Sequence, residues 1–175
     1  QASFRFIRGL WKAVHDEVNA PPPADAATAT DFNKTLLTTP QKDLRRIAHQ
    51  TLAKVTDDIG RRRSFNTAVA SVMELLNAVS KHDATTLGGR VVAHEAVEIA
   101  VMCLSPMIPH VTHVLWRELG HHNALITESW WAPDPDALVQ DTIEISVQVN
   151  GKMRARIPIA AGASGEEAVA AAKAD

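Results

Sequence analysis

The sequence predicts a mainly α-helical fold, a bundle of about five helices, followed by a small α+β unit. Apolar residues recur at three- and four-residue steps through most of residues 2–119, which is the period of helices with one buried face. From residue 143 the period changes to two, which is typical of strands. We therefore divide the chain into a bundle at residues 1–130, a linker at residues 131–140 and the truncated start of a C-terminal α+β domain at residues 141–175.

Residues 41–77 organise the bundle, because they contain two helices joined by a short basic turn. Gly60 breaks the helical pattern, and Asn66 offers a side-chain oxygen to the first turn of the next helix. We call residues 60–63 the basic joint. The apolar stripe of the first helix consists of Leu44, Ile47, Ala48, Thr51, Leu52, Val55 and Ile59. We expect Lys42, Arg45, Arg46 and His49 on its opposite, solvent-facing side.

Positive charge is concentrated in the same stretch. Residues 38–66 contain seven Lys or Arg against three Asp, a net charge of +4 in a chain whose total is −2. Guanidinium groups match phosphate oxygens two at a time, and a helix N-terminus also attracts phosphate. The run Arg61, Arg62 and Arg63 therefore predicts a phosphate-binding joint. The alternative is a solvated surface on which these arginines pair with Asp57 and Asp58.

The remaining helices follow the same reasoning. Residues 2–19 form an amphipathic helix, and the prolines that begin at Pro21 predict a loop through residue 37. Residues 90–104 are apolar around most of the helix, which predicts a central position in the bundle. A fifth helix is expected from Pro109 to about Gly120. Trp130 and Trp131 then pack back onto the bundle, since each would otherwise expose a large apolar area.

The C-terminal unit begins with a predicted hairpin. Residues 143–149 alternate apolar and polar side chains, and Asn150-Gly151 is a strong two-residue turn signal. Lys152, Arg154 and Arg156 fall on the polar face of the second strand. Ser164 with Glu167 predicts the start of a final helix.

Several classes of function are not supported by the sequence. It contains no apolar run of the roughly 20 residues that span a bilayer and no secretory signal. The single cysteine, Cys103, lies among apolar residues and is expected to be an inert core thiol. His110, His113, His121 and His122 lack the cysteine or carboxylate partners of a typical zinc site, so we expect helix-end or packing roles for them. A histidine-metal hydrolase is the alternative.

Three stretches resemble a known family. HQTLAKVTDDIGRRRSFNTAVASVMELLN at residues 49–77 closely resembles the helical tRNA-binding domain of bacterial leucyl-tRNA synthetases. LSPMIPHVTHVLWRELG at residues 104–120 is similar to a helix that the class I synthetases for leucine, isoleucine, valine and methionine share. VQVNGKMRARI at residues 147–157 looks like the strand–turn–strand that opens the C-terminal domain of the leucine enzymes. The same region of a valine or isoleucine enzyme, or a freestanding protein-interaction module, is the alternative.

The resemblance implies a class I synthetase bundle of the anticodon-binding type, within a cytoplasmic ATP-dependent leucine–tRNA ligase that uses ATP and Mg. The chain lacks the His-x-Gly-His and Lys-Met-Ser-Lys-Ser-like motifs of adenylate formation, and Leu119-Gly120-His121-His122 has the wrong order. No editing insert is present either. We therefore expect no catalytic residue, metal site or cofactor in this chain, and no activity from it alone. Its expected partners are a leucine tRNA and the missing catalytic domain, with neither membrane nor DNA.

The tRNA-binding residues are expected in the basic stretch and on the hairpin. They are Lys42, Arg45, Arg46, Lys54, Arg61, Arg62, Arg63, Asn66, Lys152 and Arg154. The resemblance implies docking along the tRNA backbone without reading the anticodon bases. Backbone contacts fix position but carry no sequence information.

Overall fold

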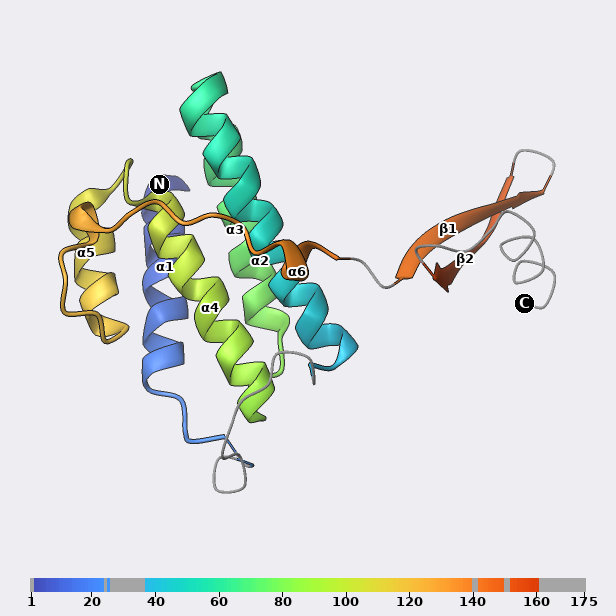
Figure 1. Cartoon of the computed structure of the whole chain (residues 1–175), viewed down its shortest axis with the longest axis horizontal. Coiled ribbons are helices and arrows are strands. Elements are labelled where there is room, and N and C mark those ends of the chain that lie inside the picture. Colours follow the sequence, from blue (N-terminus) through green and yellow to red (C-terminus); the bar gives the residue numbers. More distant parts are fainter. Residues whose placement is uncertain (1, 24, 26–36, 140–141, 150–151, 161–175) are drawn as a thin grey trace. The chain divides into compact units, whose positions relative to one another are not determined.

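The computed structural model describes residues 2–23, 25, 37–139, 142–149 and 152–160 of the chain. The chain separates into two compact units, residues 1–138 and residues 139–175, and each is described here by itself. The first unit is helical, and the second contains a pair of strands (Figure 1). Among the described residues, no helix has both the length and the apolar character that a membrane crossing requires.

In the described part of the first unit there are five helices of ten or more residues, in the order expected from the apolar period (Figure 1). They are α1 (Ala2–Val18), α2 (Thr39–Asp57), α3 (Phe65–Lys81), α4 (Leu87–Leu104) and α5 (Pro109–Glu118). Helix α4 packs against each of the other four. The prediction of a central, nearly all-apolar helix is therefore confirmed, although α4 begins three residues earlier than expected.

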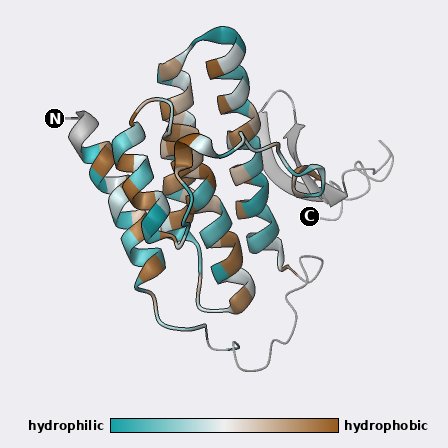
Figure 2. Ribbon diagram, turned by 60° about the vertical axis from the view of Figure 1, so that its left-hand side comes forward, coloured by the Kyte–Doolittle hydropathy of each residue, from teal (hydrophilic) through white to brown (hydrophobic). Residues whose placement is uncertain are grey.

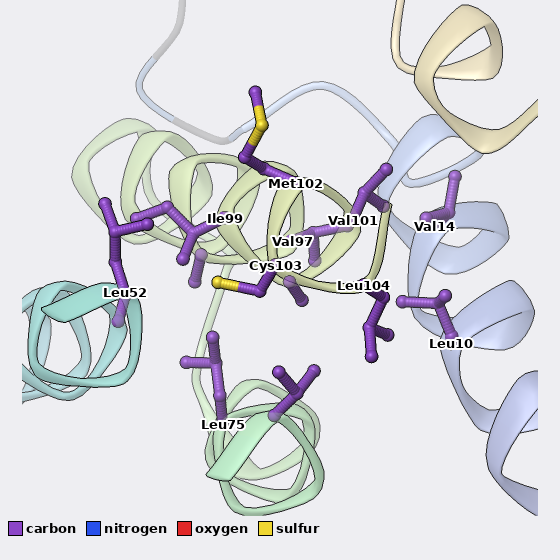
Figure 3. Close-up of a cluster of buried hydrophobic side chains, with 14 of the residues drawn as sticks. Leu10, Val14, Leu52, Leu75, Val97, Ile99, Val101, Met102, Cys103 and Leu104 are labelled. Carbon is purple, nitrogen blue, oxygen red and sulfur yellow. The ribbon is translucent and has the colours of Figure 1, made fainter. Parts of the chain in front are cut away.

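Side chains from all sides of α4 fill the core. Figure 3 shows Ile99 and Val101 leaving the helix in different directions, while Leu52, Leu75 and Leu10 approach it from α2, α3 and α1. Each of these side chains is fully buried. Burying one such side chain contributes about 1.5–3 kcal/mol before the entropy cost of ordering it. The outer sides of the helices are largely hydrophilic (Figure 2).

The N-termini of α2 and α4 are capped and joined to each other. Thr38 and Gln41 form a capping box at α2, in which the Thr38 backbone N–H donates to Oε1 of Gln41 at 3.0 Å. At α4, the hydroxyl of Thr86 accepts from the Gly89 backbone N–H at 3.2 Å. The Gln41 amide also donates to this hydroxyl at 3.1 Å. One pair of side chains thus fixes where both helices start.

Residues 121–138, which we call the closing segment, run back across the bundle after α5. They include the short turn η3 (Leu125–Thr127) and the one-turn helix α6 (Pro135–Leu138). Trp131 packs against the core, with its ring centroid 5.6 Å from that of Trp116. The indole N–H of Trp130 donates to Oγ1 of Thr56 on α2 at 2.8 Å. The expected packing against the core is confirmed for Trp131, whereas Trp130 contacts α2 through its hydrogen bond and remains 37% exposed.

The second unit contains β1 (Thr142–Val149) and β2 (Lys152–Ala160), which pair antiparallel. Ile145 pairs with Ile157, and the register shifts between Val147 and Gln148. The expected Asn150-Gly151 turn and the final helix after Ser164 lie outside the described residues.

Candidate nucleic-acid interface

The basic joint is built on a π turn. Helix α2 passes directly into η2 (Asp58–Arg62), and Arg63 ends this turn in the left-handed region at φ 53°. The backbone N–H groups of Arg63 and Ser64 both donate to the carbonyl of Asp58. Gly60 therefore lies inside the turn, near the end of the helical segment, as its break in the apolar pattern indicated. The helix widens before it stops, which an apolar period of 3.6 cannot reveal.

Two arginines of the joint share one carboxylate. Arg61 donates from Nε and Nη2 to the two oxygens of Asp57 at 2.5 and 3.0 Å, and Nε of Arg62 lies 2.8 Å from Asp57 Oδ2. Hydrogen bonding to Arg61 is the main cause that holds the pKa of Asp57 below its ordinary value. Both guanidinium side chains stay largely open to solvent, with 72% and 59% of their surface exposed.

Arg63 differs from its neighbours. Its side chain is exposed and makes no hydrogen bond or ion pair with any residue in the described part of the chain. Its left-handed backbone turns the chain from η2 into α3. The joint therefore contains one unpaired guanidinium beside two that are paired but accessible.

A buried aspartate, Asp58, stabilises the joint. The side chain of Asp58 is only 2% exposed and lies 3.3 Å from Nζ of Lys54, which also donates to Oγ of Ser71 on α3 at 2.6 Å. A hydrogen bond from Thr67, and then the contact with Lys54, lower the pKa of Asp58 against the effect of its burial. Lys54 thus connects α2 to α3 while half of its side chain stays exposed.

The expectation that Arg45 and His49 face solvent is wrong. Their relative exposures are 5% and 6%. Nε of Arg45 donates to Glu95 on α4 at 2.8 Å, and its Nη2 donates to Asp134 in the closing segment. Burial alone would lower the pKa of Arg45, but the hydrogen bonds to these carboxylates outweigh it and raise the pKa. We call Arg45, His49, Glu95 and Asp134 the Arg45 cluster.

The cluster has a simple physical reason. Helix α2 is covered on one side by α4 and on the next by α6. Its buried face is therefore wider than the apolar stripe, and carboxylates on the covering elements compensate the buried charge. The period of one helix contains no information about those partners.

The other expected contact residues remain on the surface where the structure describes their side chains. Lys42 is exposed, and Arg46 pairs with Asp43 at 2.9 Å. Asn66 is exposed in the first turn of α3, but Ser64 is the N-cap residue, so the capping role expected of Asn66 is wrong. Lys152 and Arg154 lie on β2, where Arg154 is the extra residue at the register shift.

Two histidines, His121 and His94, take packing and ion-pair roles. His121 stacks on Trp116, with ring centroids 3.5 Å apart, and contacts Glu98. His94 lies 3.5 Å from Glu17 and 3.4 Å from Glu98, and these carboxylates raise its pKa to about 9. Within the part of the chain that the structure describes, no three His, Cys, Asp or Glu residues form a possible metal site.

Comparison with known proteins shows the family to which this chain belongs. Residues 41–170 match the family model for the anticodon-binding domain of tRNA ligases. The chain belongs to this family. It is 50% identical to the leucine–tRNA ligase of Pseudoalteromonas atlantica over 163 residues, which are 93% of this chain and 18% of that protein. It is 47% identical to the leucine–tRNA ligase of Thioalkalivibrio sulfidiphilus over 175 residues, which are 100% of this chain and 21% of that protein.

A solved structure of a leucyl-tRNA synthetase has a similar fold. The LeuRS of Agrobacterium radiobacter K84 agnB2, solved as a ternary complex with tRNA and LeuAMS, matches all of this chain and 22% of its own length with a TM-score of 0.76. At 18% identity this match supports the fold alone. The resemblance to leucyl-tRNA synthetases and the mainly helical fold expected from the sequence are confirmed. The chain spans about a fifth of the length of these relatives.

Proposed function

We propose that this anticodon-binding domain docks a leucine tRNA for a leucine–tRNA ligase by gripping backbone phosphates at the basic joint. The observation that carries the proposal is the grouping of Arg61, Arg62 and Arg63 at the joint between α2 and α3, all exposed and one unpaired. Lys54 on α2 adds an ammonium group on a side chain that is about half exposed. Arg45 is left out of this contact set because two carboxylates occupy its guanidinium.

Phosphate contact explains the joint better than base stacking does. The joint has one exposed aromatic neighbour, Phe65, and the whole sequence contains no Tyr. Stacking platforms for single-stranded RNA need several aromatic side chains. Guanidinium groups bind phosphates through charge and paired hydrogen bonds, and the joint contains three exposed guanidinium side chains. The domain therefore fixes the position of the tRNA and leaves base identity unread.

The chemistry of ligation is assigned to the rest of the polypeptide. The relatives are about five times longer than this chain and are named leucine–tRNA ligases. In this proposal the parent protein joins leucine to tRNA with ATP and Mg, and the present domain holds the tRNA against that catalytic part. Lys152 and Arg154, on β2 of the second unit, are proposed as further tRNA-binding residues.

A salt-dependent titration tests the proposal. Binding of a leucine tRNA and of one unrelated tRNA is measured by fluorescence anisotropy at several salt concentrations. The variant R61A/R62A/R63A should bind more weakly, and the slope of log affinity against log salt should flatten by roughly one unit for each lost phosphate contact.

A matched control uses the positive side of α1. The variant R5A/R8A/K12A removes the same three charges from residues that are also exposed. It should leave the slope nearly unchanged. Equal losses in both variants would mean that tRNA responds only to net charge, and no binding at low salt would contradict the proposal itself.

A further inference from the structure

The carboxylate of Asp57 places a negative charge within the surface that we propose binds phosphate. Its two oxygens accept hydrogen bonds from Arg61, and one of them also lies 2.8 Å from Nε of Arg62. Asp57 is itself about one-third exposed, on the same surface as the two guanidinium groups. Its negative charge therefore stands where an RNA phosphate would approach.

The π turn makes this sharing possible. In an α-helix, a residue reaches its fourth neighbour along the chain, so Asp57 would contact Arg61 alone. A π turn also brings the fifth neighbour along the chain close to that residue. Here η2 brings Arg62, five residues after Asp57, to the same carboxylate. The turn thus gathers two cations on one anion and leaves Arg63 beyond its reach.

We propose that Asp57 competes with RNA phosphates for Arg61 and Arg62 and thereby limits the affinity of the joint for tRNA. This inference rests on the proposed function. The first contact is made by Arg63, whose guanidinium is unpaired. A phosphate then replaces the carboxylate on Arg61 and Arg62, and Asp57 remains nearby as a repelling charge.

The strength of the pairs decides the direction of the effect. Exposed pairs at this spacing each favour the paired state by roughly two-fold, so a phosphate can displace them and the arginines gain little preorganisation from them. A phosphate carries a full charge and binds a guanidinium with two hydrogen bonds. Removing the Asp57 charge should therefore strengthen tRNA binding.

Substitution of Asp57 by Asn tests the inference. D57N keeps the size of the side chain and removes its charge, and it should bind leucine tRNA about three- to five-fold more tightly than the unmodified chain at low salt. The gain should fade as salt rises, because salt screens exposed charges. D57E, which keeps the charge, should restore the original affinity.

The control is D16N on α1. Asp16 also forms an exposed pair with a cation four residues away, Lys12, so this variant changes the net charge by the same amount. It should leave tRNA affinity within two-fold, which separates a local effect from a general one. Circular dichroism melts of all variants check that each remains folded.

The outcomes separate the two proposals. If the unmodified chain binds tRNA but D57N binds equally well or more weakly, the proposal that Asp57 competes with phosphate is wrong. The carboxylate would then position the arginines. If D57N and D16N strengthen binding equally, the effect belongs to net charge and the inference also fails. If the unmodified chain and D57N both fail to bind tRNA, the proposed function itself is overturned.

Discussion

The backbone N–H of Asp134 donates to Nδ1 of His49, 85 residues earlier, at 3.1 Å. Because Nδ1 accepts this bond, the ring proton lies on Nε2, which then donates to Oε1 of Glu95 at 3.2 Å. One imidazole therefore connects the closing segment to α2 and α4. Arg45, one turn earlier on α2, pairs with the carboxylates of the same two residues, Glu95 and Asp134.

Replacing Arg45 by Met should destabilise the first unit. The substitution keeps much of the apolar volume but leaves Glu95 and Asp134 without their buried cation. Breaking a fully buried pair costs about 3–5 kcal/mol. We expect about 2–3 kcal/mol here because Glu95 and Asp134 are partly exposed. Urea unfolding followed by circular dichroism measures this loss.

The matched variant is R46M on the same helix. Arg46 is partly exposed and its partner Asp43 is exposed, so loss of this pair should cost less than about 1 kcal/mol. Similar losses for both variants would show that the Arg45 cluster contributes no more than a surface pair.

His94 should make stability depend on pH above neutrality. Hydrogen bonding to Glu17 and then to Glu98 raises its pKa from 6.5 to about 9 in the folded chain. Its stabilising contribution is therefore complete below about pH 6.5 and is lost as the pH rises through about 9. H94Q should cost about 1–2 kcal/mol near pH 6, a value reduced for the 38% exposure of the side chain, and almost nothing above pH 9.

Two measurements check this prediction. Histidine proton shifts in NMR give the pKa of His94 directly, and denaturant unfolding across pH gives the free energy. H122Q is the control, since His122 is exposed and forms no ion pair with a described residue. A constant difference between the unmodified chain and H94Q from pH 6 to 9.5 would contradict the linkage.

Substitution by alanine should change stability in opposite directions at two glycines, Gly60 and Gly120. A Cβ at either Gly60 or Gly120 meets no atom within 4 Å, so crowding does not distinguish them. Gly120 has φ +97°, where a side chain is strained, and G120A should lower stability by about 1–2 kcal/mol. Gly60 has no positive φ, and G60A should raise stability by about 0.5–1 kcal/mol. Thermal melts compare the two, and a shift of the same sign in both would refute the backbone argument.

Cys103 should be inert until the bundle unfolds. The residue is fully buried, and burial raises the pKa of its thiol to about 12. Ellman's reagent at pH 8 should therefore find no reactive thiol in the native chain and one per chain in denaturant. Rapid labelling under native conditions would show that α4 is more accessible than the structure indicates.

The sequence predicted the elements that depend on local periodicity. Alternation at three and four residues located the helices, and the nearly unbroken apolar face of residues 90–104 correctly indicated the centre of the bundle. The change to a period of two located both strands. These features could be predicted because burial repeats with the geometry of each element.

The sequence did not predict features that depend on partners far along the chain. Arg45 and His49 looked solvent-facing because their compensating groups, Glu95 and Asp134, lie 46 or more residues away in sequence and on other elements. The π turn was missed because its hydrogen bonds leave no mark in the apolar pattern. Pairing of the joint arginines with Asp57 and Asp58 was the stated alternative to phosphate contact. That Arg61 and Arg62 share the single carboxylate of Asp57 was not predicted.

The closing segment also has a consequence for the speed of folding. Helix α3 packs on its sequence neighbours α2 and α4. In contrast, Trp130 reaches Thr56 across 74 residues and Asp134 reaches Arg45 across 89. Closing such long loops costs chain entropy before any contact repays it, and non-local contacts slow folding. The helices should therefore form first and the closing segment should dock last. In a refolding experiment, the tryptophan signal should lag behind the helical signal, and the Arg45 cluster should form in that final step.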